Sequence, residues 1–295
     1  MSKTVGNNMN KTHEILLIFI SLLILNACEE KSIIRNELES LGINNADFFK
    51  IDTTFSESKL IEKLRFVKSD KEDIRISFYE SGKKKSFIPT KNSQVHGKCT
   101  DWYENGQIKW NRFYDAGNSI KQSVTYDENG NRTKIDDFID GSFTEFYDND
   151  KPLFKRSDKM YIDYYINGQI KSSFVKENDS LTKVKCFNEN GKSVFIGKAD
   201  SKFALYKNDT LYSGEITCEF LDGQISFNQK YLNGMPDGKT FSKYGNKNME
   251  FELEFKNGTA IGIHKRYFLN GQIQSTKDYD TKEYKEWDKK GNLVE

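Results

Sequence analysis

The segment Tyr164-Tyr165-Ile166-Asn167-Gly168-Gln169-Ile170 decides the fold, because close copies of it recur along the chain. The copies lie at residues 102–108, 220–225 and 267–273. Each copy carries an aromatic residue, then Asn-Gly or Asp-Gly, then Gln-Ile. Asn-Gly occurs seven times after residue 100, at 105, 129, 167, 190, 233, 257 and 270. Self-similarity of this kind is typical of repeat proteins.

Each copy predicts a β-hairpin. Asn-Gly supplies the two residues with positive φ that a type I′ turn requires. After the turn, residues 108–112 alternate apolar and polar side chains, which is typical of a half-buried strand. The residues that we assign to the repeat turns are Asn105, Gly106, Asn129, Gly130, Asn167, Gly168, Asp222, Gly223, Asn270 and Gly271.

The spacing of the turns predicts how the hairpins assemble. From Gly82 to Gly191 the turn positions step by 18 to 24 residues. One hairpin is marginally stable alone, so neighbouring units must pair edge to edge. We therefore expect an all-β fold of repeated antiparallel hairpins, each of about 18–26 residues, in an extended twisted sheet or solenoid. A short helical segment is expected at the N-terminal end.

Composition supports strands and excludes one class of partner. Aromatic residues make up 14% of the chain, hydrophobic residues only 36%, and there are three prolines. Aromatic residues favour strands, and the low aliphatic content favours a thin sheet. The formal net charge is +1, with charges of both signs interspersed. Nucleic acid is not expected as a partner, because binding it requires a basic stripe that engages phosphates.

The N-terminal segment predicts export and a lipid anchor. Lys11 precedes an apolar run over residues 15–25, which is too short to span a bilayer as a helix and is typical of a secretion signal. Leu25-Asn26-Ala27-Cys28 resembles the bacterial lipobox, in which the cysteine is lipidated and becomes the first mature residue. The alternative is an uncleaved anchor with an incidental cysteine. Translation could begin at Met1 or at Met9.

A lipidated Cys28 implies a stable membrane anchor, because a lipoprotein cysteine carries more than one acyl chain. Glu29 and Glu30 resemble the acidic tether of some lipoproteins on the outer leaflet. We expect the protein in the cell envelope, at the outer membrane, with the periplasmic and surface leaflets both open.

Three domains are predicted: a signal peptide over 1–27, a tether and short helical region over 28–74, and the repeats over 75–295. Apolar spacing predicts short helices over 31–41 and 56–67. We expect these helices to cap the first sheet edge, because an open edge promotes aggregation.

The chemistry-bearing residues predict no catalytic centre. Cys99, Cys186 and Cys218 stand in strand-like contexts, which predicts buried thiols, with one disulfide open in an oxidising envelope. No serine elbow, phosphate loop or paired histidine motif occurs. We predict no enzyme, metal or cofactor; a glycan-acting carboxylate pair is the alternative that the acidic residues leave open.

The repeat resembles the MORN-variant repeat of bacterial proteins often labelled YwqK-type antitoxins. The best matches are residues 96–108, 237–245 and 262–273, and the resemblance extends over about 75–295. Asp150 and Asp209 replace turn glycines, and residues 195–212 are irregular. The resemblance implies an all-β repeat sheet with a binding or scaffolding role, and no catalytic residue. Its label implies an antitoxin or immunity role as the alternative.

Aromatic residues at one repeat position predict a binding face. Neighbouring residues of a strand point to opposite sides, so one of each aromatic pair should pack and the other could be exposed. The candidates are Trp102, Tyr103, Tyr164, Tyr165, Phe220, Tyr267 and Phe268. The leading hypothesis is a membrane-anchored binding or scaffold protein for an envelope protein or glycan that the sequence does not identify. The oligomeric state is left open.

Overall fold

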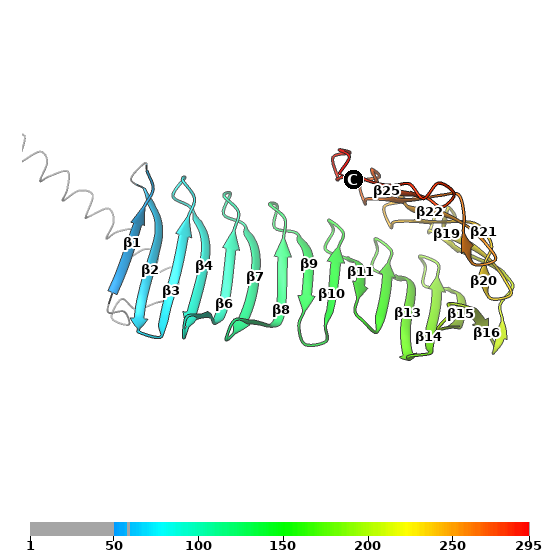
Figure 1. The fold of residues 1–295 in the computed structure, drawn as a ribbon, viewed down its shortest axis with the longest axis horizontal. Helices are drawn as coiled ribbons and strands as arrows, with labels where there is room; N and C mark the ends of the chain where they lie inside the picture. Colours follow the sequence, from blue (N-terminus) through cyan, green and yellow to red (C-terminus); the bar gives the residue numbers. More distant parts are fainter. Residues whose placement is uncertain (1–49, 58–59, 295) are drawn as a thin grey trace, which may run out of the picture. The chain divides into compact units, whose positions relative to one another are not determined.

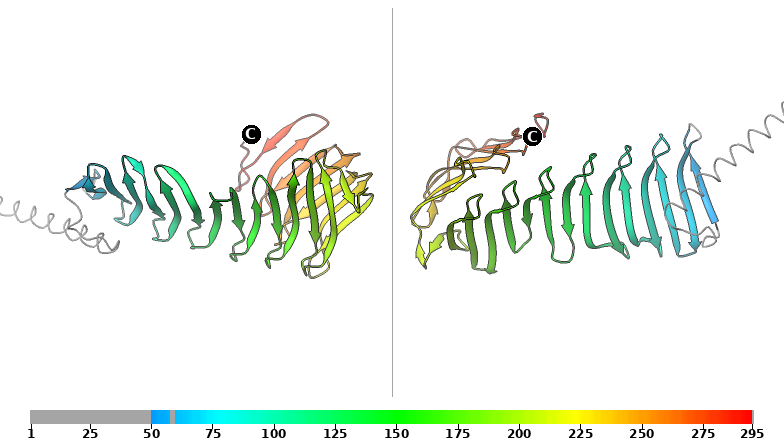
Figure 2. Two further views of the ribbon diagram at one scale, coloured as in Figure 1. Left: turned by 90° about the horizontal axis from the view of Figure 1, so that it is seen from below. Right: turned by 180° about the vertical axis from the view of Figure 1, so that it is seen from behind.

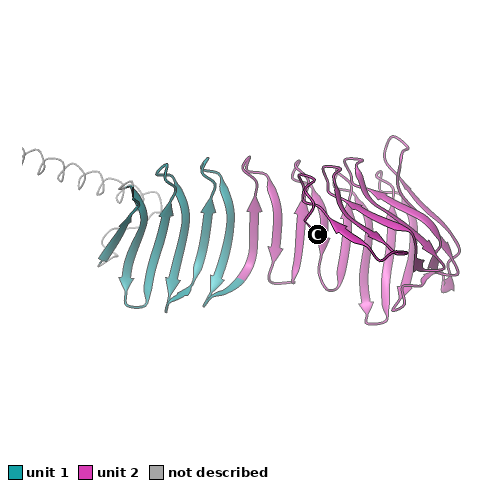
Figure 3. Cartoon of the chain, turned by 45° about the horizontal axis from the view of Figure 1, so that its top comes forward, with its two compact units in different colours: residues 1–119 teal, residues 120–295 magenta. Residues whose placement is uncertain are grey.

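The computed structural model describes residues 50–57 and 60–294 of the chain. In these residues the fold is all-β, with antiparallel hairpins in extended open sheets, so the predicted fold class is confirmed (Figure 1). The predicted signal peptide, Cys28 and the helix predicted over 31–41 lie outside the described residues. The chain divides into two compact units, residues 1–119 and 120–295 (Figure 3).

Unit 1 holds consecutive antiparallel strands that pair in the order β1-β2-β3-β4-β6-β7, with the short β5 beside β4. These strands are β1 (Lys50–Phe55), β2 (Ile61–Ser69), β3 (Glu72–Phe78), β4 (Lys84–Lys91), β5 (Gln94–Val95), β6 (Gly97–Trp102) and β7 (Ile108–Asp115). Their apolar side chains form a cluster of Leu64, Phe66, Ile76 and Phe78.

The helix predicted over 56–67 is wrong, because β2 (Ile61–Ser69) occupies most of this segment. The apolar spacing suggested a helical period, but burial follows a period of two. Leu64 and Phe66 are buried, while Lys63 before them and Arg65 between them are exposed. Pairing with β1 and β3 on both sides then overrides the weak helical pattern. The hairpins therefore begin before residue 75.

Unit 2 holds two sheets, and within this unit the second folds back over the first (Figures 1 and 2). The first sheet is formed by β8 (Asn118–Tyr126), β9 (Arg132–Asp137), β10 (Ser142–Phe146), β11 (Pro152–Arg156), β12 (Met160–Tyr164), β13 (Ile170–Asn178), β14 (Leu181–Phe187), β15 (Ser193–Asp200), β16 (Leu205–Lys207) and β17 (Thr210–Leu211). Each of these strands pairs with the next.

The second sheet of unit 2 runs in the order β18-β19-β21-β22-β24-β25-β26, with the short β20 and β23 beside β19 and β22. Its strands are β18 (Gly214–Glu219), β19 (Ile225–Leu232), β20 (Met235–Pro236), β21 (Gly238–Lys243), β22 (Met249–Lys256), β23 (Thr259–Ala260), β24 (Ile263–Tyr267), β25 (Ile273–Asp278) and β26 (Tyr284–Glu286).

The repeat turns differ from the predicted type I′ geometry. At Asn167-Gly168 only the glycine has positive φ, the Gly168 N–H donates to the Tyr165 carbonyl oxygen at 2.8 Å, and the Tyr165 N–H donates to the Gln169 carbonyl oxygen at 2.8 Å. This is a three-residue hairpin, a type I turn closed by a left-handed glycine. Two-residue turns with positive φ at both positions occur at the opposite strand ends, as at Asn233-Gly234 and Asn257-Gly258.

Each repeat hairpin carries a β-bulge just after its turn. In the β12–β13 pair, Tyr164 lies opposite Ile170 and Asp163 lies opposite Ser172, so Lys171 is the extra residue. Ser226 and Glu250 are the extra residues of two hairpins in the second sheet. A bulge redirects a side chain relative to strict alternation. Lys171 is consequently 5% exposed and Ser226 is fully buried.

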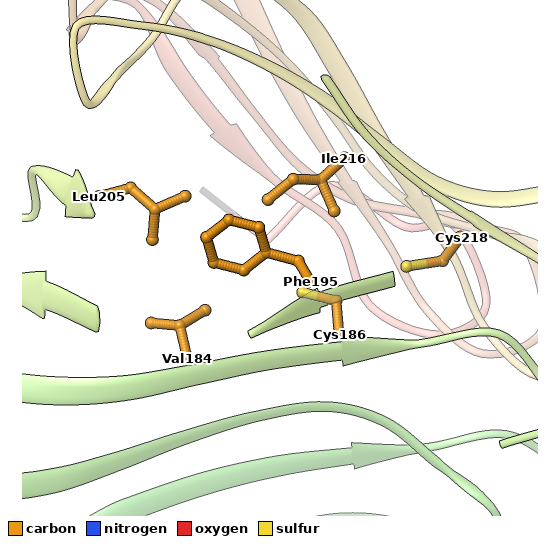
Figure 4. Packing of buried hydrophobic residues seen from close by; sticks show 6 residues of the cluster. All are labelled: Val184, Cys186, Phe195, Leu205, Ile216 and Cys218. Carbon is orange, nitrogen blue, oxygen red and sulfur yellow. The ribbon is translucent and has the colours of Figure 1, made fainter. Parts of the chain in front are cut away.

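The core of unit 2 joins its two sheets. Val184, Cys186, Phe195 and Leu205 of the first sheet pack with Ile216 and Cys218 of the second (Figure 4). The three cysteines of the described chain, Cys99, Cys186 and Cys218, are free and buried, as their strand contexts predicted.

Candidate functional site

A groove between the two sheets of unit 2 gathers charged and aromatic side chains. Three adjoining cavities of about 510, 730 and 740 Å³ lie along it. The 510 Å³ cavity shares Arg156 and Phe174 with the second and Glu250 and Arg266 with the third, while Tyr161 lines all three. Cavities of this size hold small-molecule ligands in other proteins. We call this feature the inter-sheet groove.

The first sheet contributes an aromatic row to the groove. The ring centroids of Phe143 and Phe154 are 5.6 Å apart, those of Phe154 and Tyr161 are 6.0 Å apart, and those of Tyr161 and Phe174 are 6.3 Å apart. Cross-strand register explains the row, because Tyr161 lies directly opposite Phe174 and residues paired this way share one face. Arg156 lies opposite both Phe143 and Tyr161, so its side chain is on this face too.

Lys171 crosses from the first sheet to the second at the groove. Its Nζ donates to Ser242 Oγ at 2.5 Å and to the Lys243 carbonyl oxygen at 2.8 Å, and lies 3.1 Å from Glu250 Oε2. Ser242 Oγ also donates to Glu250 Oε2 at 2.5 Å. The ammonium group is thus fully hydrogen-bonded, which a buried charge requires.

Asp163 lines the same cavity and is held in an environment that disfavours its charge. Burial, followed by the neighbouring Glu250 carboxylate, raises the pKa of Asp163 to about 6, although Lys171 opposes this shift. Ser172 Oγ donates to Asp163 Oδ2 at 3.1 Å. Burial and the same two carboxylates also raise the pKa of Tyr161. The shifts therefore come from a shared desolvated cluster.

Two arginines line the 510 Å³ cavity from opposite walls and remain exposed to solvent. Arg156 belongs to β11 of the first sheet, and Arg266 belongs to β24 of the second. The Arg266 guanidinium lies 6.0 Å from the centroid of the Phe251 ring. Neither arginine has a carboxylate partner among the described residues. Both guanidinium groups are therefore available to a ligand.

The predicted aromatic binding face is only partly accessible. Tyr165 is 0% exposed and Phe220 is 3% exposed, and their rings pack edge to face with centroids 5.8 Å apart between the two sheets of unit 2. These two residues are core residues and cannot contact a ligand. The other candidates are half-buried: Trp102, Tyr103, Tyr164, Tyr267 and Phe268.

The second aromatic residue of the repeat instead connects neighbouring hairpins. The Tyr165 hydroxyl donates to the carbonyl oxygen of Phe187 at 2.9 Å, and that carbonyl lies one residue before the equivalent position of the next repeat. Three other tyrosines repeat this bond, donating from Tyr79 to Trp102, from Tyr147 to Tyr164 and from Tyr244 to Tyr267. The tyrosine thus recurs at this repeat position because its hydroxyl joins one hairpin to the next.

The turn asparagines have a structural role of the same kind. Asn167 Oδ1 accepts from the Gln169 N–H at 2.9 Å, and its Nδ2 donates to the Glu189 carbonyl oxygen of the next hairpin at 3.2 Å. Asn270 makes the equivalent pair of bonds to Gln272 and Lys289. Asp222 can only accept, and it binds the Gln224 N–H. The other predicted turn residues, Asn105, Gly106, Asn129, Gly130, Gly168, Gly223 and Gly271, also lie in turns.

None of the charged residues of the inter-sheet groove was predicted from the sequence. Asp163, Lys171 and Glu250 come together only because the second sheet covers the first. One feature of the repeat pointed to two of these residues. Lys171 and Glu250, like Ser226, occupy the bulge position, which lies two residues after the glutamine of the repeat or its equivalent. The arginines carried no repeat signal.

Within residues 50–57 and 60–294, no group of three or more His, Cys, Asp and Glu side chains is placed to hold a metal ion. No helix in this described part of the chain is both long and apolar enough to cross a membrane.

The hairpin architecture defines a repeat protein whose sheets are built by successive β-hairpins. Residues 95–109 and 261–281 match the family model of the MORN repeat variant. A crystal structure of TarM is similar over 32% of this chain and 19% of its own, with 16% sequence identity and a TM-score of 0.25. The match thus spans about a fifth of that protein. No curated protein matches the chain.

Proposed function

We propose that this chain is a non-catalytic lipoprotein of the bacterial cell envelope whose MORN-like sheets are a binding or scaffolding surface. The ligand is an envelope protein or glycan. The MORN-variant matches and the repeated hairpin sheets support a binding or scaffolding repeat protein. Anchoring is supported by residues 25–28, and the outer membrane is the proposed location.

The observation that carries this proposal is a set of cation–aromatic pairs at the surface of unit 1. Lys84 Nζ lies 5.4 Å from the centroid of the Trp102 ring, and the Arg112 guanidinium lies 4.7 Å from that of Trp110. Trp102 lies opposite Ile108, whereas Trp110 lies opposite Asp101, so the two pairs occupy opposite faces of the sheet. Trp, Tyr and Arg are the side chains enriched at interaction hot spots.

A fixed charge pattern lies on β2, β3 and β4 of the same unit. Asp73 is 6% exposed, and its carboxylate accepts from Arg65 Nε at 2.7 Å and from Thr90 Oγ1 at 2.5 Å. Burial alone would raise the pKa of Asp73, but hydrogen bonds from Thr90, Arg65 and Arg75 lower it below the ordinary value. The carboxylate therefore remains ionised and holds both arginines in place. A fixed arrangement of charges of this kind supports specific recognition of a partner.

Crosslinking in intact cells tests the proposed partner. The chain is captured after crosslinking and its partners are identified by mass spectrometry, with binding to isolated cell-wall glycan measured in parallel. A stoichiometric partner of either class that is lost in Trp102→Ala or Trp110→Ala, but kept in Ile139→Ala, supports the proposal. Ile139 is a matched control because it is apolar and 79% exposed but makes no aromatic pair. Loss of binding in none of the variants would overturn the proposed surface.

The anchor has an independent test. Cys28→Ser should move the protein from the membrane fraction to the soluble fraction, because the thiol that would carry the acyl chains is absent. A Cys99→Ser variant keeps Cys28 and should stay with the membrane. Unchanged sedimentation of Cys28→Ser would overturn lipid anchoring without affecting the proposed binding surface.

A further inference from the structure

We propose that the inter-sheet groove of unit 2 is a binding site for a small organic anion with an aromatic body. The site is the 510 Å³ cavity, with Arg156 on one wall and Arg266 on the other. This site is separate from the surface of unit 1 and does not depend on the function proposed above.

Charge complementarity calls for an anion. Among the charged residues that line the cavity, Lys171 and Glu250 form an ion pair with each other. Asp163 accepts a hydrogen bond from Ser172, and the two arginines outnumber its single negative charge. Within the part of the chain that the structure describes, the guanidinium groups of Arg156 and Arg266 have no carboxylate partner. Guanidinium groups bind carboxylate, sulfonate or phosphate oxygens through paired N–H donors.

The walls between the arginines call for an apolar, ring-shaped body. Tyr161 and Phe174 line the cavity from the first sheet, and Phe227 and Phe251 line it from the second. In the register of each sheet an arginine stands directly opposite an aromatic residue, Arg156 opposite Tyr161 and Arg266 opposite Phe251. A planar body can contact these rings while its anionic group reaches a guanidinium.

The same walls argue against a sugar. The cavity's neutral hydroxyl side chains, apart from the Tyr161 phenol, are those of Ser172 and Ser242. Ser172 already donates to Asp163, and Ser242 already donates to Glu250 while accepting from Lys171. The polar groups left for a ligand are therefore the guanidinium groups of Arg156 and Arg266, whose charge favours an anion over a neutral sugar.

The probe is 8-anilinonaphthalene-1-sulfonate, compared with N-phenyl-1-naphthylamine, which has the same rings but no sulfonate. Both are titrated by fluorescence into the full chain and into the Arg156→Gln/Arg266→Gln double variant. The difference between the two proteins isolates binding that depends on the arginines from any binding elsewhere. We expect a saturable difference for the sulfonate, one molecule per chain, and none for the neutral amine. Each single arginine variant should lower the affinity for the sulfonate about tenfold.

Lys155→Gln is the matched control. Lys155 neighbours Arg156 on β11, so its side chain points to the opposite face, where it lies 3.3 Å from Asp140 Oδ2. Its removal changes the net charge equally and should leave sulfonate binding unchanged. 2-Naphthoate should displace the sulfonate, and 2-naphthamide should not.

Three results would overturn the proposal. The first is identical sulfonate titrations for the wild-type chain and the double variant. The second is equal displacement of the bound sulfonate by naphthoate and by naphthamide. The third is that the double variant loses binding of the sulfonate and of the neutral amine to the same extent. The unfolding midpoint of each variant, measured by circular dichroism, separates loss of the site from loss of the fold. Because both arginines are exposed, their replacement should leave that midpoint within a few degrees of the wild-type value.

Discussion

Lys171 and Glu250 form a buried ion pair, with 3.1 Å between Nζ and Oε2, that links the two sheets of unit 2. The two side chains are 6% and 16% exposed, and they lie 79 positions apart in the chain. Both occupy the bulge position of their hairpins. The bulge redirects both side chains, and the ion pair therefore joins the second sheet to the first at a defined position.

Lys171→Met should destabilise the chain by about 3–5 kcal/mol, because it leaves the Glu250 carboxylate without its buried partner. The double variant Lys171→Met/Glu250→Leu should be more stable than the single variant, since the Glu250 carboxylate that lost its partner is removed as well. Urea unfolding followed by circular dichroism measures both. Lys183→Met is the control, because Lys183 forms an ion pair with Glu177 through a side chain that is 53% exposed. Exposed pairs of this kind contribute about 1 kcal/mol or less to stability. Equal losses for Lys171→Met and Lys183→Met would contradict the structural role.

Asp163 should make the stability of unit 2 depend on pH. Burial and Glu250 raise its folded pKa to about 6, above its ordinary value of 3.8, so the folded chain favours the protonated form. Its contribution to stability is then greatest below pH 4 and is lost as the pH rises from about 4 to 6. Asp163→Asn should remove this dependence and be more stable than wild type at pH 7, by on the order of 1 kcal/mol.

Thermal unfolding between pH 3 and pH 8 measures this difference. Asp140→Asn is the contrasting variant, because hydrogen bonds from Ser142 lower the pKa of the Asp140 carboxyl instead. Its removal should bring no gain at pH 7. A pH profile of Asp163→Asn parallel to that of wild type would show that Asp163 is not the titrating group.

Tyr165→Phe should cost about 1–3 kcal/mol, although the ring remains in place. The lost hydroxyl donates to the Phe187 carbonyl and lies 2.8 Å from Ser226 Oγ, so the substitution leaves buried polar atoms without a partner. Tyr164→Phe, one residue earlier, is the matched control and should change stability by less than about 0.5 kcal/mol. Chemical unfolding measures the stability of both variants. An unchanged free energy of unfolding in Tyr165→Phe would refute the connection between hairpins.

Gly245→Ala should separate the two sheets of unit 2 locally. A Cβ at Gly245 would lie 2.3 Å from the Ile166 backbone nitrogen and 2.7 Å from the Tyr147 hydroxyl, which accepts from the Gly245 N–H. We expect a loss of about 2 kcal/mol or more, because backbone on the facing sheet must move.

Gly223→Ala is the comparison, because nothing lies within 4 Å of its added Cβ and its φ of +82° alone is unfavourable. Strain of this kind costs about 1–2 kcal/mol. Amide hydrogen exchange should show faster exchange at Ile166 in Gly245→Ala and not in Gly223→Ala. Equal exchange in the two variants would indicate that the close approach is not maintained in solution.

The hairpin repeat could be predicted from the sequence because its determinants are local. The aromatic residue, the asparagine and the glycine of residues 165–168 make bonds within one turn and to the next hairpin. The turn type was mispredicted because Asn-Gly is compatible with both a two-residue and a three-residue loop, and pairing of the flanking strands decides between them. The helix predicted over 56–67 failed because its apolar residues fit both periods.

The inter-sheet groove could not be predicted, because it depends on contacts between residues 61 to 98 positions apart. Nothing in the local pattern distinguishes Lys171, which is buried, from Lys109 at the equivalent repeat position, which is exposed. The sequence by itself determined the β-hairpin, its repetition and the residues of its turns. Only the tertiary structure decided which repeats are covered by a second sheet, because burial is a property of the facing layer. That covering layer places Tyr165 in the core and leaves Arg156 facing a cavity.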